Sequence, residues 1–137
     1  MIIFEIFGIP IAQGRAKFYR RGDYVGAYDP KKSKDAKHDF KSQSLQYKPN
    51  KLITEAISLD LIFYLPRPKS LPKKVMKHIK RPDLDNLIKL VKDALTGIFW
   101  KDDSQIIMII AEKKYCPVNE TPRTRVEIEE VDNPALR

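Results

Sequence analysis

The sequence contains almost no cysteine, the residue that disulfide-bonded folds and zinc–thiolate sites require. Cys116 is the only cysteine among 137 residues, which excludes a disulfide framework and a zinc site built from thiolates. No apolar run is long enough to span a bilayer, and the first residues lack the basic start of a signal peptide. We therefore expect a protein of the reducing cytoplasm without a membrane partner, in which Cys116 is a small core residue.

Two common catalytic signatures are also missing, because we find neither a glycine-rich phosphate loop nor a Ser-His-Asp constellation. Acidic residues are outnumbered: the formal net charge is +8 and the sequence pI is about 9.5. Such an excess favours a polyanionic partner, with nucleic acid as the first candidate and a merely basic protein as the alternative. The length fits a single domain over residues 1–137.

Alternating and continuous apolar patterns predict the strands. A first strand over 2–7 is expected to be mostly buried, and a long strand over 53–65 to turn one apolar face to the core. The isoleucine-rich run over 105–116 suits a strand buried on both sides, with 124–131 as its antiparallel neighbour. A basic surface helix is expected over 31–47. The order predicts an α/β or α+β fold, a mixed sheet with helices packed on it.

Two segments concentrate positive charge. The first follows residue 14 and interleaves basic residues with aromatic ones, so it is either a DNA contact with stacking rings or a solvated hairpin whose aromatics pack on the core. The second, residues 66–81, contains no acidic residue and several prolines, and we call it the basic arm; we expect it to be exposed and mobile. The candidate DNA-binding residues are Arg15, Lys17, Arg20, Arg21, Arg67, Lys69, Lys73, Lys74, Lys77, Lys80 and Arg81.

The arm leads into the stretch on which the functional interpretation depends. Pro82-Asp83 is typical of a helix start, Gly97 of a helix end, and apolar residues recur between them at three- and four-residue intervals. That apolar face consists of Leu84, Leu87, Ile88, Val91, Leu95 and Ile98. At a helix start the capping residue is not helical, so the carboxylates of Asp83 and Asp85 can converge beyond the helix end. A second pair, Asp102-Asp103, follows the helix.

Carboxylates and a nearby lysine suit a metal-dependent nuclease, since Mg²⁺ and Mn²⁺ prefer oxygen ligands that also position a phosphate. Lys89 could balance the acids or stabilise charge that develops on phosphate. The alternative is structural, because aspartates stabilise helix starts and are common in turns.

The run from Arg81 to Lys89, followed by Phe99-Trp100 and Asp102-Asp103, resembles the RusA family of Holliday-junction resolvases. The resemblance implies that Asp83, Asp85 and Asp103 are the essential acids that bind Mg²⁺ or Mn²⁺, and that Lys89 is the catalytic lysine. It also implies a structure-selective endodeoxyribonuclease that cuts four-way DNA junctions in recombination and repair. A related nuclease that cuts flaps, and a non-enzymatic nucleic-acid-binding module, are the alternatives.

Two symmetric cuts require two sites, so we expect a two-fold homodimer. Apolar surface for such a contact is expected at Leu90, which falls off the main apolar face of the central helix, and on the strand over 106–110.

Overall fold

The computed structural model describes residues 1–28 and 30–132. The pair Asp29-Pro30 is typical of a helix start, but Asp29 lies outside these residues. Residues 133–137, where the sequence predicts a frayed end, and the side chain of Tyr28 lie outside them as well. The strands are β1 (Ile2–Phe7), β2 (Lys17–Arg21), β3 (Tyr24–Tyr28), β4 (Ala56–Leu65), β5 (Ile106–Tyr115) and β6 (Arg123–Val131). The helices are α1 (Lys31–Ser44) and α2 (Leu84–Leu95), with 3-10 turns η1 (Leu45–Tyr47) and η2 (Asp103–Gln105).

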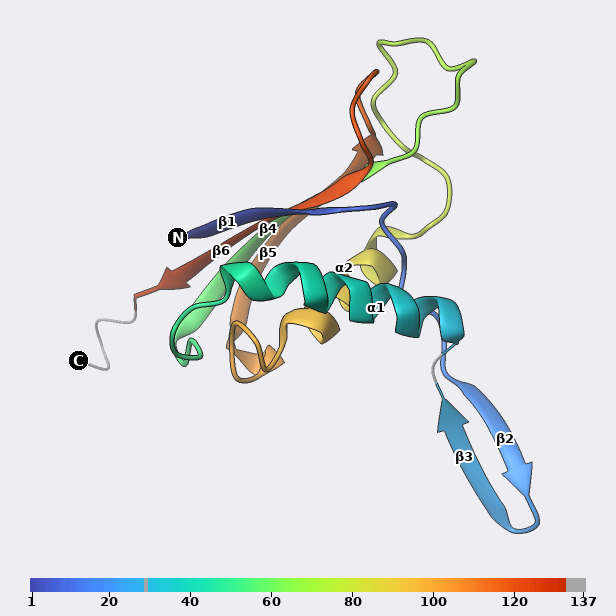
Figure 1. Cartoon of the computed structure of the whole chain (residues 1–137), viewed down its shortest axis with the longest axis vertical. Coiled ribbons are helices and arrows are strands. Elements are labelled where there is room, and N and C mark those ends of the chain that lie inside the picture. The colour runs from blue at the N-terminus through green and yellow to red at the C-terminus, as the bar shows by residue number, and fades with distance from the viewer. Residues whose placement is uncertain (29, 133–137) are drawn as a thin grey trace.

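Four strands form a mixed sheet in the order β1-β6-β4-β5, and both helices lie on one side of it (Figure 1). Strands β4 and β5 run parallel and are joined through α2, while β6 pairs antiparallel with both β4 and β1. The predicted fold class, a mixed sheet with helices packed on it, is confirmed.

The prediction that the last two strands are neighbours was wrong. After β5 the chain crosses the end of β4, where the Cys116 amide donates to the Leu65 carbonyl at 2.7 Å, and β6 then inserts between β1 and β4. In this position both edges of β6 are paired, whereas beside β5 one edge would have been left open. A short connection therefore does not decide which strand is the neighbour.

The core lies between the sheet and the two helices. Alternate residues of β4 from Ile57 to Leu65 point inward and are almost completely buried, as the period of two predicts. Phe99 and Trp100 close the core beyond the end of α2 and are fully buried. Cys116 is buried as well, and burial raises the pKa of its thiol.

Two strands are less buried than the sequence indicated. Ile3 and Phe7 of β1 are 50% and 54% exposed, because no helix covers the second face of the sheet in the described part of the chain. In β5, Ile107 and Ile110 are 62% and 58% exposed. The expectation that this strand is buried on both sides was wrong, because β5 is an edge strand with only one covered face.

Helix α2 begins and ends close to the predicted limits. Asp83 is its N-cap residue, and the chain leaves the helix through Gly97 at φ +88°, a left-handed conformation that glycine adopts readily. Leu90 is 3% exposed and belongs to the core, so its predicted role as spare apolar surface was wrong. The helix packs on α1 as well as on the sheet, and this widens its buried face. Across the described residues, no helix combines the length and the apolar character needed to cross a membrane.

The first basic segment forms a two-stranded hairpin, β2–β3, that projects from the body (Figure 1). Its connection is the residue pair Gly22-Asp23, a recognised two-residue hairpin signal. Phe18 and Tyr24 are 75% and 62% exposed, which rules out, for these two rings, the alternative in which the aromatics pack on the core.

The basic arm contains no helix or strand and is exposed over most of its length. It is nevertheless tied back to the sheet, because the Tyr115 amide donates to the Met76 carbonyl at 2.8 Å and Lys77 forms a β-bridge with Lys114. The arm therefore covers the last residues of the open edge of β5.

Candidate active site at the two ends of helix α2

The first end of α2 presents two exposed carboxylates. Asp83 adopts extended backbone angles as the N-cap residue, yet its side chain accepts no capping hydrogen bond. Asp85 lies in the first turn, and its Oδ1 accepts from the Asn86 amide at 2.9 Å. Three of the four carboxylate oxygens thus have no bond to the helix end that they face. The positive end of the helix dipole stabilises these carboxylates and a phosphate beside them. Their free oxygens are the ligands that a cation shared with a phosphate prefers.

Lys89 and a basic cavity flank these acids. Lys89 is exposed one helical turn after Asp85, on the same side of α2. Asp83 and Asn86 also line a surface cavity of about 890 Å³, together with Arg15, Lys32 and Arg81. Positive side chains around a carboxylate make this cavity suitable for a phosphate-bearing strand.

The segment before Asp83 is fixed by a lysine of β5. The Lys113 ammonium group donates to the carbonyls of Lys80 and Pro82 at 2.5 and 2.7 Å, which holds the end of the arm beside the sheet. The ring of His78 packs on Tyr115 at 4.7 Å, and burial, followed by the charge of Lys113, lowers the pKa of His78. The lowered pKa of His78 favours the neutral form of its imidazole ring.

The other end of α2 carries Asp103. Its Oδ1 accepts from the Thr96 hydroxyl at 2.6 Å, and Thr96 Oγ1 in turn accepts from the indole N–H of Trp100 at 2.9 Å. The Thr96 hydroxyl also lies 2.7 Å from the Lys92 carbonyl, but it has one proton, and a charged carboxylate is the stronger acceptor. The fully buried Trp100 therefore orients Asp103 through Thr96.

The turn that carries Asp103 is held by a capping box. Asp102 accepts from the Ser104 amide at 2.9 Å, while its own amide donates to Gln105 Oε1 at 2.7 Å. The Gln105 side chain also donates to the carbonyls of Ile53 and Glu55 at 2.8 and 2.9 Å. Hydrogen bonds from Ser104 lower the pKa of Asp102, whose role here is structural.

One chain does not bring the three predicted ligands together. Asp83 and Asp85 lie at the start of α2 and Asp103 beside its last turn, and a 12-residue helix spans roughly 18 Å. Within residues 1–28 and 30–132, no three acidic, histidine or cysteine side chains form a group that could hold a metal ion. The assignment of all three acids to one metal site thus stays a prediction, and it requires a second chain.

Comparison with known proteins identifies the class of molecule to which this arrangement belongs. The family described as "Endodeoxyribonuclease RusA" matches residues 8–129. The chain belongs to the RusA family. It is 32% identical over 127 residues to the "Crossover junction endodeoxyribonuclease rusA" of Lactococcus phage r1t, covering 89% of this chain and 82% of that protein. It is also 37% identical over 140 residues to the "Uncharacterized protein YqaN" of Bacillus subtilis strain 168, covering 95% and 96%.

Most of the predicted DNA-binding residues of this RusA-family nuclease have exposed side chains, whereas Arg67 is partly buried. Its guanidinium group donates to the carbonyls of Cys116, Pro72 and Val75 at 2.8, 3.0 and 2.6 Å. Arg67 thus folds the basic arm on itself. The remaining residues of this set are exposed: Arg15, Lys17, Arg20, Arg21, Lys69, Lys73, Lys74, Lys77, Lys80 and Arg81.

Sequence reasoning did not identify three residues that position parts of the candidate site. Lys113 fixes the chain before Asp83, while Thr96 and Gln105 orient the turn that contains Asp103. The capping box in Asp102-Asp103-Ser104-Gln105 follows a recognisable spacing, and that signal could have indicated Gln105. No local pattern links Lys113 to Pro82, because their contact depends on the crossover from β4 to β5.

The bond between Thr96 and Trp100 leads to a stability prediction. Thr96→Val keeps the shape of the side chain but leaves the buried indole N–H without its acceptor, so it should lower the free energy of unfolding by about 1–3 kcal/mol. Thr96→Ser keeps the hydroxyl group, so its free energy of unfolding should be much closer to that of the unaltered protein. Denaturant unfolding can be followed through the fluorescence of Trp100, the only tryptophan. Thr121→Val, at an exposed threonine, is the control; equal losses in the two valine variants would contradict the proposed bond.

Proposed function

We propose that this protein is a divalent-metal-dependent endodeoxyribonuclease that resolves four-way DNA junctions by paired symmetric nicks. Membership of the RusA family supports a nuclease, and the name of the Lactococcus phage relative supports a crossover junction as the substrate. The observation that carries the proposal is the exposed pair Asp83 and Asp85 at the start of α2, beside a cavity lined with arginine and lysine. Such a reaction takes place on cellular DNA, so we assign the protein to the cytoplasm.

The acids at the start of α2 fit Mg²⁺, with Mn²⁺ as an alternative. Mg²⁺ is usually held by one or two carboxylates while its other positions take water and substrate phosphate, and the free oxygens of Asp83 and Asp85 meet that requirement. When bound, the ion supplies a nucleophilic water at neutral pH and neutralises charge on the phosphate. Lys89, one helical turn after Asp85, would orient the scissile phosphate, and Arg15 and Arg81, which line the cavity, would hold the strand against it.

A two-fold dimer completes the site with Asp103 of the partner subunit. The arm covers the edge of β5 at Lys114 and Tyr115, which leaves the edge from Ile106 onward open. Antiparallel pairing of two such edges, centred on Ile109, sets Ile106 opposite Glu112 of the partner subunit. Asp103 then approaches the partner's Lys113, and Lys113 holds the chain directly before Asp83. Each site thereby gains a third acid from the other chain.

The apolar side chains of β5 that no helix covers, Ile107, Met108 and Ile110, supply area that the contact can bury.

A mixing experiment distinguishes a site shared by two chains from a site within one chain. Asp83→Asn and Asp103→Asn should each abolish nicking when tested alone. After the two variants are mixed and allowed to exchange subunits, each heterodimer has one site with both acids intact, so nicking should return. An Asp83→Asn and Asp85→Asn mixture is the matched control, because both substitutions fall at the same helix end and every site keeps a defect. Failure of the first mixture to recover activity, despite demonstrated heterodimers, would contradict the shared site.

The basic arm should contribute to binding through phosphate contacts. Replacing Lys73, Lys74 and Lys77 with glutamine should weaken junction binding and flatten its salt dependence by about 0.9 in log–log slope per lost contact. Lys48→Gln with Lys51→Gln, at exposed lysines in the connection between η1 and β4, should leave the slope unchanged. Binding measured by fluorescence anisotropy at several salt concentrations provides the test. An unchanged slope in the arm variant would mean that these lysines face solvent in the complex.

A further inference from the structure

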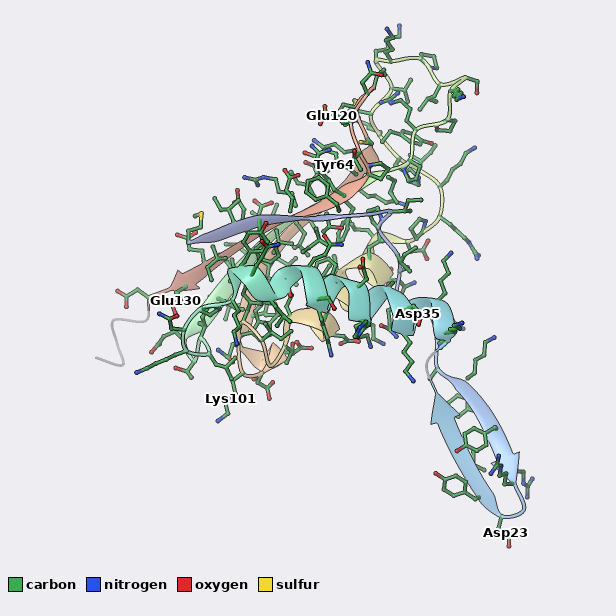
Figure 2. The ribbon with its side chains drawn as sticks, in the orientation of Figure 1. Asp23, Asp35, Tyr64, Lys101, Glu120 and Glu130 are labelled. Carbon is green, nitrogen blue, oxygen red and sulfur yellow. The ribbon has the colours of Figure 1, made fainter. Side chains whose placement is uncertain are left out.

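The β2–β3 hairpin is the most exposed element of the molecule. Every described side chain from Arg15 to Val25 is exposed, and Figure 2 shows Asp23 at the far tip, away from the sheet and helices. A two-stranded hairpin is marginally stable in water without a packed face. A ligand that covers this hairpin would therefore supply stabilisation that the body of the protein does not.

Both faces of the hairpin carry large apolar or aromatic side chains. The strand register puts Phe18 on the same face as Val25, and Tyr19 on the opposite face with Tyr24 and Gly26. The rings of Tyr19 and Tyr24 are 6.1 Å apart. A Cβ atom at Gly26 would lie 2.4 Å from the Tyr19 ring, so glycine is required for that ring to lie across the strand. A hairpin that packs on a protein surface needs one apolar face, whereas this one has two.

Charge and position indicate what covers these faces. Lys17, Arg20 and Arg21 lie between the rings, with Asp23 as the only acidic residue from Arg15 to Tyr28. The base of the hairpin is joined to the active site: the Gln13 amide donates to the Asn86 carbonyl at 3.0 Å, and the Gly14 amide to Ser33 Oγ at 2.7 Å. A five-residue strand then extends roughly 17 Å from that base. The ligand is therefore polyanionic, continuous with the cut strand, and able to contact both faces at once.

We propose that the β2–β3 hairpin inserts between the base-pair stacks at the branch point of DNA, where Phe18 and Tyr24 stack on bases on its two sides. The inference rests on the proposed function, because branched DNA is the substrate that offers separated stacks. Aromatic rings replace base stacking at low cost, while the neighbouring basic residues contact the flanking phosphates. Linear duplex lacks such a gap, so the hairpin contributes selectivity for branches in addition to general affinity.

Affinities for a four-way junction and a linear duplex of the same sequence, measured in EDTA without cleavage, test the insertion. Base–aromatic stacking predicts that Phe18→Ala with Tyr24→Ala weakens junction binding by about 5- to 150-fold per lost stack and leaves duplex binding unchanged. Phe18→Trp with Tyr24→Trp, which keeps stacking rings, should retain the preference for junctions. Leu45→Ala, at a residue that is 49% exposed in η1, is the control for loss of an exposed apolar group.

Three results would overturn insertion: no preference for junctions in the unaltered protein, equal losses on junction and duplex in the alanine variant, or loss of the preference in the tryptophan variant. Light scattering of the alanine variant must give the mass of the unaltered protein, since a fall in mass would identify the hairpin as a contact between two copies of the chain. Nicking by the unaltered protein with Mg²⁺ is measured separately. A protein that nicks junctions without the binding effect would retain the proposed function and refute only the insertion.

Discussion

Helix α2 is fixed by an apolar face that is buried between the sheet and α1, and both halves of the candidate site depend on that placement. Because α2 is the crossover between the parallel strands β4 and β5, its start lies beside the end of β5 and its last turn beside the beginning of β5. The acids Asp83 and Asp85 are thus held at one end of β5, and Asp103 at the other. This separation follows from the topology, since a helix that connects parallel strands must run antiparallel to them.

The same constraint is the reason why we propose a second chain. A two-fold axis across the middle of β5 exchanges the ends of β5 and α2, which is the operation needed to combine acids from opposite ends. It would also cover the open edge of β5, and exposed edges are otherwise prone to unspecific pairing. A single dimer contact would then both complete the catalytic site and protect the edge of β5. The basic arm would limit how far two edges can pair, because it already occupies the edge at Lys114 and Tyr115.

Sequence reasoning succeeded where the relevant information is local. The helix start at Asp83, the period of two in β4 and the concentration of charge in the arm each follow from neighbouring residues, and the structure has them as expected. It failed where the outcome depends on topology. The isoleucines of β5 gave the same pattern as a strand buried on both sides, and no residue in 116–122 indicated that β6 would pair with β4. The burial of Leu90 likewise depends on α1, which packs on α2 from a distant part of the sequence.

We propose that this RusA-family protein cuts branched DNA in a reaction that requires a divalent metal. The most direct test is incubation of the purified protein with a labelled four-way junction, a flap and a linear duplex of matched sequence, each with Mg²⁺ and with EDTA. We expect symmetric nicks in two opposing strands of the junction, with little cleavage of the duplex and none in EDTA. Equal cutting of all three substrates, or cutting of the junction in EDTA, would contradict it.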